Sequence, residues 1–176
     1  MPSNLGRHYL ILEQSKLINA LIIFILNRTE FSFEGNMSKK IEILNPPGLG
    51  PAQGLYSQAT LVPAGLDTYH IAGQLSVGKD GSIVGIGDFE AQFEQVYNNL
   101  GDVLQALGEN YDSVIAMHTF LVHSQSIPKF MELRKNLFST IFSGPVYPPN
   151  TLLMVDRLVK EEFVIEVEAV AAKQHK

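Results

Sequence analysis

Two stretches of the chain carry apolar residues at spacings of three and four, the pattern of amphipathic helices. The first has Asp88 where an N-cap is expected and Gly108 where a helix would end. Its apolar stripe consists of Phe89, Phe93, Val96, Tyr97, Leu100, Val103, Leu104 and Leu107. The second begins near Ser126-Ile127-Pro128 and ends before Gly144-Pro145, with Phe130, Leu133, Leu137, Ile141 and Phe142 on one face. The pattern predicts two helices, each with one face turned to a core.

Short apolar or alternating segments bounded by turn residues predict strands in the rest of the chain. They cover residues 40–44, 56–62, 68–76, 113–122, 151–158 and 163–172. The second and third are separated by Pro63-Ala64-Gly65-Leu66-Asp67, a turn of hairpin length. The order strand-strand-strand-helix-strand-helix-strand-strand predicts the α+β class: a single domain with two helices packed on one face of a mixed β-sheet.

The first 36 residues differ from the rest of the chain. Residues 17–26 are nearly all apolar, but a helix that spans a bilayer needs about 20 apolar residues. No clear small-x-small cleavage site follows, and Met37-Ser38-Lys39-Lys40 resembles an ordinary cytosolic start. We therefore expect the domain to cover residues 37–176. Residues 1–36 are then a leader, an upstream-start artefact or a poorly packed extension, and a cleaved signal peptide is the alternative.

Composition excludes several classes of protein. The 176 residues are 45% hydrophobic and 18% charged, which is too apolar for a disordered chain. Cysteine is absent, which excludes disulfides, thiol nucleophiles and cysteine-ligated metals and fits a cytoplasmic location. The formal net charge of −5 argues against nucleic acid as a partner. No segment predicts attachment to a membrane.

Neither a metal site nor a phosphate site is indicated. His118 and His123 are five residues apart on a predicted strand, which places them on opposite faces, and the five histidines form no known ligand motif. We predict no metal. Gly85-Ile86-Gly87 precedes a helix but lacks the rest of a dinucleotide fingerprint, and we interpret it as a flexible approach to that helix.

Two carboxylates, Glu166 and Glu168, stand out in the last predicted strand. Alternation puts them on one face, about 6.6 Å apart along the strand. Three interpretations remain open: a solvated sheet face, a general acid/base or water-orienting group in a cleft, and an oligomer interface.

Several short motifs together resemble the YjgF/RidA (Rid, L-PSP) family. They occur in the family's order from about Tyr56 to Ala172: Tyr56-Ser57-Gln58-Ala59, Ile71-Ala72-Gly73-Gln74, Gly87-Asp88-Phe89-Glu90-Ala91-Gln92, Asn98-Asn99-Leu100 and Ile165-Glu166-Val167-Glu168-Ala169-Val170-Ala171. The resemblance implies a chorismate-mutase-like fold and a homotrimer with small-molecule clefts between subunits. It also implies hydrolysis of reactive enamines or imines to carbonyl compounds and ammonia, with no cofactor.

The resemblance also assigns roles to individual residues. Glu166 matches the catalytic glutamate that handles water, and Tyr56 and Gly73 match substrate-binding positions. Asn150 stands where the family has a carboxylate-binding arginine, and Ala72 where it often has a serine. Losing a charged bidentate pair would lower the affinity for an α-imino acid by about ten- to several hundred-fold.

The sequence identifies no other basic residue that would take over the carboxylate-binding role of that arginine. Arg157, seven residues after Asn150 in one predicted strand, would point to the opposite face, and the sequence does not place Arg134 or Lys135. Three hypotheses follow. The first is a deaminase whose substrate is not a standard 2-imino acid. The second is a non-catalytic trimer that binds a small metabolite, and the third is a ribonuclease.

Overall fold

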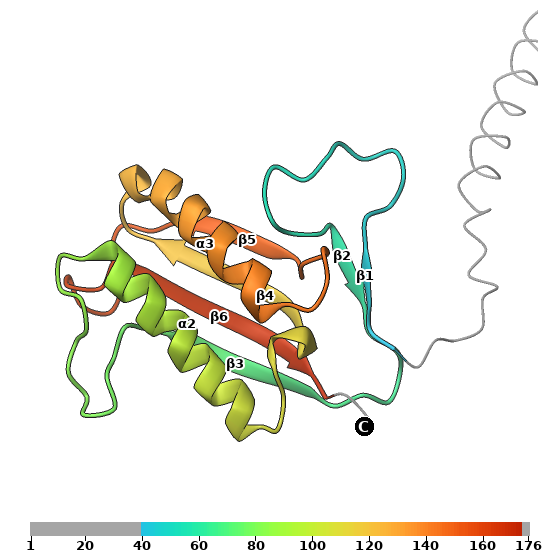
Figure 1. The fold of residues 1–176 in the computed structure, drawn as a ribbon, viewed down its shortest axis with the longest axis horizontal. Coiled ribbons are helices and arrows are strands. Elements are labelled where there is room, and N and C mark those ends of the chain that lie inside the picture. Colours follow the sequence, from blue (N-terminus) through green and yellow to red (C-terminus); the bar gives the residue numbers. More distant parts are fainter. Residues whose placement is uncertain (1–39, 174–176) are drawn as a thin grey trace, which may run out of the picture. The chain divides into compact units, whose positions relative to one another are not determined.

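A four-stranded mixed sheet covered on one face by two helices forms the body of the protein (Figure 1). The computed structural model describes residues 40–173, so the predicted extension of residues 1–36 lies outside the described residues. The sheet has the order β3-β6-β4-β5. Its strands are β3 (Thr68–Gln74), β4 (Val114–Leu121), β5 (Asn150–Met154) and β6 (Ile165–Ala172). The helices are α2 (Phe89–Ala106) and α3 (Ile127–Ile141), with short 3-10 turns at Tyr111–Ser113 and Ser124–Ser126.

The pairing of the strands makes the sheet mixed, as predicted. β6 lies between β3 and β4 and is antiparallel to both, whereas β4 and β5 are parallel. Parallel neighbours need a crossover connection, and here α3 supplies it. Because β6 is hydrogen-bonded to a strand on each side, its backbone is held in place along both edges. β6 is also the strand that carries Glu166 and Glu168.

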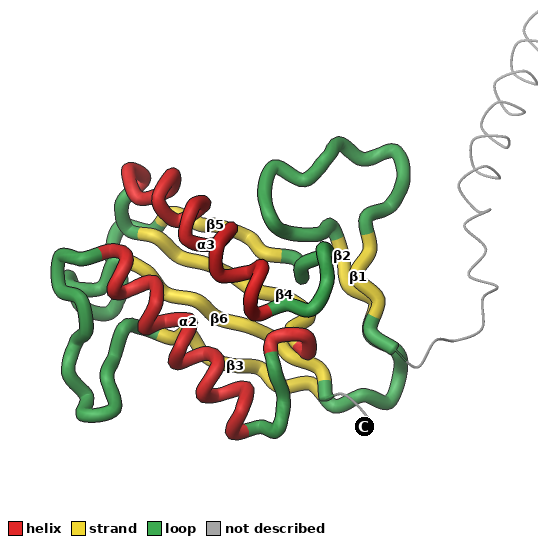
Figure 2. The backbone as a smooth tube through the Cα atoms, in the orientation of Figure 1, coloured by secondary structure: helices red, strands yellow, loops and turns green. Residues whose placement is uncertain are grey.

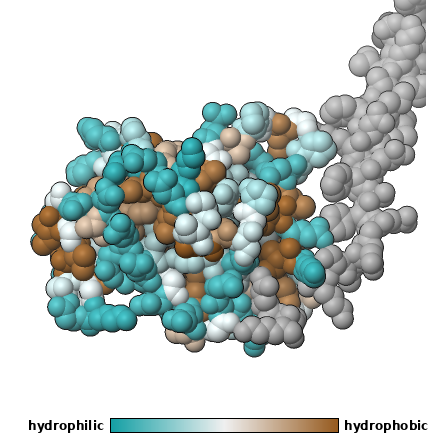
Figure 3. All heavy atoms as spheres, viewed as in Figure 1, coloured by the Kyte–Doolittle hydropathy of each residue, from teal (hydrophilic) through white to brown (hydrophobic). Residues whose placement is uncertain are grey.

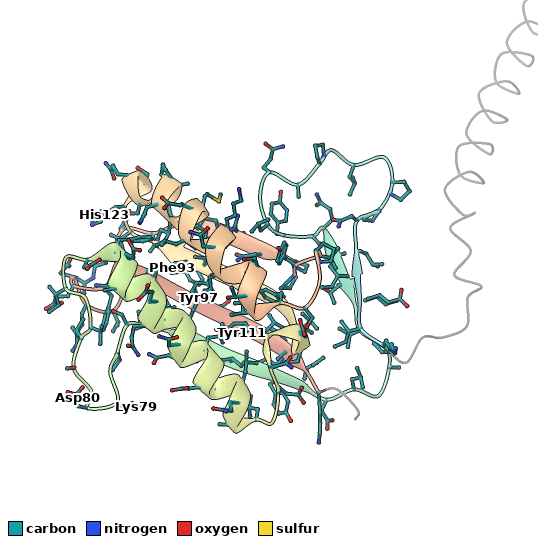
Figure 4. The ribbon with its side chains drawn as sticks, in the orientation of Figure 1. Lys79, Asp80, Phe93, Tyr97, Tyr111 and His123 are labelled. Atoms are coloured by element: carbon teal, nitrogen blue, oxygen red, sulfur yellow. The ribbon has the colours of Figure 1, made fainter. Side chains whose placement is uncertain are left out.

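The core lies between the sheet and the helices. The N-cap predicted at Asp88 is confirmed, because its side chain accepts a hydrogen bond from the backbone N–H of Ala91 at 3.1 Å. Figure 4 shows Phe93 and Tyr97 projecting from α2 toward α3, where Phe93 packs against Phe130 at 6.0 Å between ring centroids. Polar side chains cover much of the outer surface of the helices, with apolar side chains exposed among them (Figure 3). The helical stripes predicted from the sequence therefore form the buried side of each helix.

A small second sheet corrects one expectation. β1 (Glu42–Leu44) and β2 (Ala59–Leu61) pair with each other, antiparallel, and form a separate two-stranded sheet (Figure 2). The turn at residues 63–67 therefore does not close a hairpin between β2 and β3, because β3 pairs with β6 instead. The hairpin interpretation used the length of the turn alone, whereas the partners of both strands come from distant parts of the chain.

The parallel edge strand is shorter than predicted. β5 ends at Met154, so Arg157 lies beyond the strand and forms an ion pair with Glu161 at 3.0 Å. His123 likewise follows the end of β4. Among residues 40–173, no helix is both long and apolar enough to span a membrane.

Candidate functional site

Glu166 lies near one end of β6, on the face of the sheet that the helices leave uncovered. Its neighbours Ile165 and Val167 are fully buried under the helices, so alternation turns Glu166 and Glu168 to the open face. Across the strand pair, Glu166 is opposite Phe120 and Glu168 is opposite His118. The predicted side-by-side arrangement of the two glutamates is confirmed.

Gly73 makes room for the Glu166 carboxylate. A Cβ atom placed on Gly73 would lie 1.8 Å from Oε1 of Glu166, far inside van der Waals contact. The register of β3 against β6 shifts between Ile71 and Gln74, which is the irregularity that brings the Gly73 backbone beside this side chain. The preceding Ala72 is exposed, and its backbone carbonyl accepts a hydrogen bond from the side-chain Nε2 of Gln74 at 2.9 Å. Glu166, Gly73 and Ala72 are thus brought together on the open face.

The surroundings of Glu166 on this face disfavour the charged form of its carboxyl. Partial burial raises the pKa of the Glu166 carboxyl, and the nearby charge of Glu168 raises it further. Glu168 in turn pairs with Nδ1 of His118 at 2.7 Å. A carboxyl with a raised pKa can release and recover a proton closer to neutral pH, as a general acid/base requires.

The raised pKa of Glu166 predicts how stability depends on pH. The folded state binds the Glu166 proton more tightly than the unfolded state, so this residue destabilises the fold at neutral pH. That cost disappears as the pH falls through the folded-state pKa toward the unfolded-state value. We expect Glu166→Gln to raise the melting temperature at pH 7 and the difference from wild type to shrink toward zero at acidic pH. Thermal unfolding across a pH series measures this, and a difference that does not change with pH would contradict it.

A shallow depression lies on the open face beside these residues. It has a volume of about 420 Å³ and is lined by residues of β3, β4 and β6, among them His70, Ala72, His118 and Glu168. Both polar and apolar side chains therefore border this space, and Glu168, the neighbour of Glu166 on the open face, is one of them.

Asn150 occupies the other side of the sheet. It begins β5 in register with Met117, which is buried under the helices. Its Oδ1 accepts a hydrogen bond from the Thr119 hydroxyl at 3.2 Å, and Thr119 is fully buried on that same side. Within one chain, the structure therefore does not bring Asn150 together with Glu166.

Tyr56 lies on the long connection between β1 and β2. Its hydroxyl accepts a weak hydrogen bond from the backbone N–H of Gln53 at 3.4 Å. It is also close enough to the guanidinium of Arg134 to act on it electrostatically. The expected site residues thus divide into two groups, with Glu166, Gly73 and Ala72 on the open face and Asn150 on the helix side.

Arg134 is a residue that sequence reasoning did not place. It is only 3% exposed, on the inner face of α3. Its guanidinium carbon lies 5.1 Å from the centre of the Phe130 ring and 5.9 Å from that of Phe138. Helical spacing was the available signal, because Arg134 stands four residues from each of these buried phenylalanines, within the apolar stripe.

Comparison with known proteins shows similarity over most of the chain. The sequence profile described as Endoribonuclease L-PSP matches residues 49–173. A RutC family protein of Pyrococcus horikoshii is 34% identical over 130 residues, 73% of this chain and 92% of that protein. A human protein named 2-iminobutanoate/2-iminopropanoate deaminase is 29% identical over 126 residues, 72% of this chain and 82% of its own.

Solved structures agree with these relatives. The Rid family protein YyfB of Yersinia pestis superposes with a TM-score of 0.67 at 30% identity, covering 76% of this chain and 98% of that one. The structure of Escherichia coli TdcF with bound serine gives a TM-score of 0.55 at 25% identity, covering 74% of this chain and 93% of that one. The range matched by the sequence profile, residues 49–173, includes all four strands of the main sheet and both helices.

Proposed function

The chain belongs to the YjgF/RidA family, whose sequence profile is described as Endoribonuclease L-PSP, and we propose that it hydrolyses a reactive enamine or imine to a carbonyl compound and ammonia. The observation that carries this proposal is Glu166, a carboxyl with a raised pKa beside the Gly73 backbone. The family includes the human deaminase, whose name states this chemistry. The proposed catalytic unit is residues 37–176, acting in the cytoplasm.

The proposed reaction needs one group that moves a proton. Water adds to the carbon of the C=N bond while the Glu166 carboxylate accepts a proton from that water. The protonated carboxyl then gives this proton to the nitrogen, which yields a carbinolamine. In a second transfer the Glu166 carboxylate takes the proton of the carbinolamine hydroxyl and passes it to the nitrogen, so that the C–N bond breaks and ammonia leaves as the carbonyl forms. The sum is R₂C=NH + H₂O → R₂C=O + NH₃, which consumes no oxidant or reductant. This is general acid/base catalysis by a single carboxyl group, and no metal or organic cofactor enters the proposed step.

The proposed assembly is a homotrimer with the substrate in clefts between copies. The uncovered sheet face supports it, since Leu153 on the edge strand is in register with Phe120 on that face and is 38% exposed. The division of the expected site residues between two sides of the sheet also supports a cleft built from more than one copy. In this arrangement Glu166 handles water and Gly73 and Ala72 border the substrate, while Tyr56 and Asn150 contribute further contacts.

An assay of the wild-type chain tests the activity directly. Imines are generated freshly from several amino acids and from amines without a carboxylate, and ammonia release is followed against the uncatalysed rate. We expect acceleration for at least one imine. Release at the uncatalysed rate for all of them would contradict the proposal.

A non-catalytic small-molecule binder is the second candidate function. It is favoured by Asn150, whose amide oxygen is engaged by Thr119 and which carries no charge for a substrate carboxylate. Stabilisation by small metabolites without ammonia release would favour this candidate. The RNA cleavage that the profile's description suggests is tested in parallel. The net charge of −5 weighs against it.

A further inference from the structure

A hydrogen-bonded pair of His118 and Glu168 crosses from β4 to β6 on the open face of the sheet. The two residues are opposite each other in the register of the strands, and Nδ1 of His118 lies 2.7 Å from Oε1 of Glu168. Both side chains border the depression of about 420 Å³. The reaction proposed above uses neither of them, although Glu168 is the neighbour of Glu166 on this face.

The two glutamates are close enough for the charge of one to affect the other. Residues two apart on a strand are separated by about 6.6 Å and project to the same side. Among residues 40–173, Glu168 has a partner in His118, whereas Glu166 makes no ion pair. The pKa of the Glu166 carboxyl is raised first by burial and then by the charge of Glu168. A group that offsets the charge of Glu168 therefore makes Glu166 easier to ionise.

His118 is placed to offset this charge. Imidazole is the side chain whose charge ordinarily changes between about pH 5 and 8. A protonated His118 puts a positive charge beside the Glu168 carboxylate and opposes its field at Glu166, whereas a neutral His118 leaves that field at full strength. The side chains of His118 and Glu168 are 47% and 43% exposed, so both exchange protons with solvent directly.

Two other histidines lie near these strands without pairing with Glu168. His70 of β3 is in register with the residue four positions after Glu166 on β6. His123 follows the end of β4. Neither takes part in an ion pair within the described part of the chain. His118 is thus the imidazole whose charge acts on Glu168 by direct contact.

The remaining elements packed against these strands add no charge to the open face beside the pair. On β5, Thr151 and Leu153 are in register with His118 and Phe120, and neither side chain titrates. α2 packs on the opposite face of β6. Its charged residues are exposed on that side of the sheet: Glu90, Glu94 and Asp102.

We propose that Glu168 and His118 are positioning residues that act through Glu166. In this arrangement the carboxylate of Glu168 opposes the ionisation of Glu166, the protonated imidazole of His118 weakens that opposition, and the pair sets the pH above which Glu166 works as a base. This regulation rests on the proposed function, because the ionised Glu166 is the form that accepts a proton from water. The antiparallel register supplies the geometry, since it places the imidazole of β4 against the carboxylate of β6.

An NMR titration of the Glu166 carboxyl carbon tests this coupling without any substrate. The full chain is labelled with ¹³C in its glutamate side chains, and the signal that disappears in Glu166→Gln identifies the residue. Glu168→Gln removes the like charge and should lower the midpoint of the Glu166 titration by about half a pH unit or more. His118→Gln removes the opposing charge and should raise the midpoint, because carboxyl groups ordinarily ionise at lower pH than imidazole loses its proton. His118→Lys keeps a positive charge and should restore a midpoint near that of the wild type.

His70→Gln is the matched control, since it makes the same chemical change in the same depression at a residue that does not pair with Glu168. It should move the midpoint much less than His118→Gln. An unchanged midpoint in Glu168→Gln or in His118→Gln, shifts of both in one direction, or an equal effect of His70→Gln would overturn the proposal. If Glu168→Gln does not fold, the difference between His118→Gln and His118→Lys decides in its place.

The pH profile of kcat/KM connects the coupling with the reaction. Its acidic limb should lie at the midpoint of Glu166 in the wild type, at lower pH in Glu168→Gln and at higher pH in His118→Gln. A limb that stays in place while the NMR midpoint moves overturns the regulatory role. If the wild type hydrolyses no imine, the proposed function fails, whereas the NMR titration still decides whether the pair controls the proton of Glu166.

Discussion

Glu166→Gln is expected to lower the rate of ammonia release by about 10²- to 10⁴-fold, the usual contribution of a general acid/base. Glutamine has nearly the same shape as glutamate, so it still fits against the Gly73 backbone. It cannot accept a proton from water or pass one to the leaving nitrogen. We therefore expect kcat to fall while KM changes little, because the substrate contacts other than the proton transfer remain. Steady-state kinetics on the best imine from the wild-type assay measures both parameters.

A matched variant separates this effect from a general loss of acidic charge. Glu161→Gln makes the same chemical change at an exposed position that pairs with Arg157 at 3.0 Å. It should retain wild-type kinetics. Full activity of Glu166→Gln would show that another group handles the water. An equal loss in both variants would show that Glu166 has no special role.

Gln92→Leu is expected to destabilise the fold by about 3–5 kcal/mol, the largest effect on stability predicted here. Gln92 is fully buried on α2 and makes three hydrogen bonds to backbone atoms. Its Nε2 donates to the carbonyls of Glu162 at 2.6 Å and Gly85 at 3.1 Å, and its Oε1 accepts from the N–H of Val164 at 3.0 Å. Leucine fills the same volume but leaves these three groups without partners, each at a cost of about 1–3 kcal/mol.

The position of Gln92 connects stability with the site. Its bonds to Glu162 and Val164 hold the segment that leads into β6, the strand that carries Glu166. Urea unfolding measures the change in free energy, which corresponds to a drop in melting temperature of about 10 °C. Gln105→Leu is the control, since Gln105 lies exposed on the same helix and should change stability little. A loss below about 1 kcal/mol for Gln92→Leu would mean that the backbone groups find other partners.

The buried charge of Arg134 explains why position 150 holds an asparagine where the family has an arginine. The family resemblance implies an arginine at position 150, which here lies on the helix side with Thr119 and Tyr97. The buried guanidinium of Arg134 already places one positive charge beside Tyr97. A second arginine on the same side would add like-charge repulsion without a counterion. The neutral amide of Asn150 is therefore compatible with its surroundings in a way that an arginine would not be.

The elements were predictable where local patterns and tertiary packing agree. The apolar stripe of α2 and its cap at Asp88 depend on residues three or four positions apart, and the alternation of β6 depends on residues two positions apart. The structure confirms both patterns. The family assignment from scattered motifs is confirmed too. The β2–β3 hairpin was wrong because strand pairing depends on partners far away in the sequence. The β5 strand was predicted too long, because its end depends on where the neighbouring β4 stops offering hydrogen bonds.

The amino-acid sequence by itself determined the order of helices and strands, the shared face of Glu166 and Glu168, and the neutral residue at position 150. Each of these follows from periodicity or from residue identity. Only the tertiary structure decided which face of the sheet the helices cover, and so which side chains lie beside Glu166 and which beside Asn150. It also buried Arg134, because the guanidinium packs between aromatic rings of α3 and under the Gly54 backbone, contacts that no local pattern encodes.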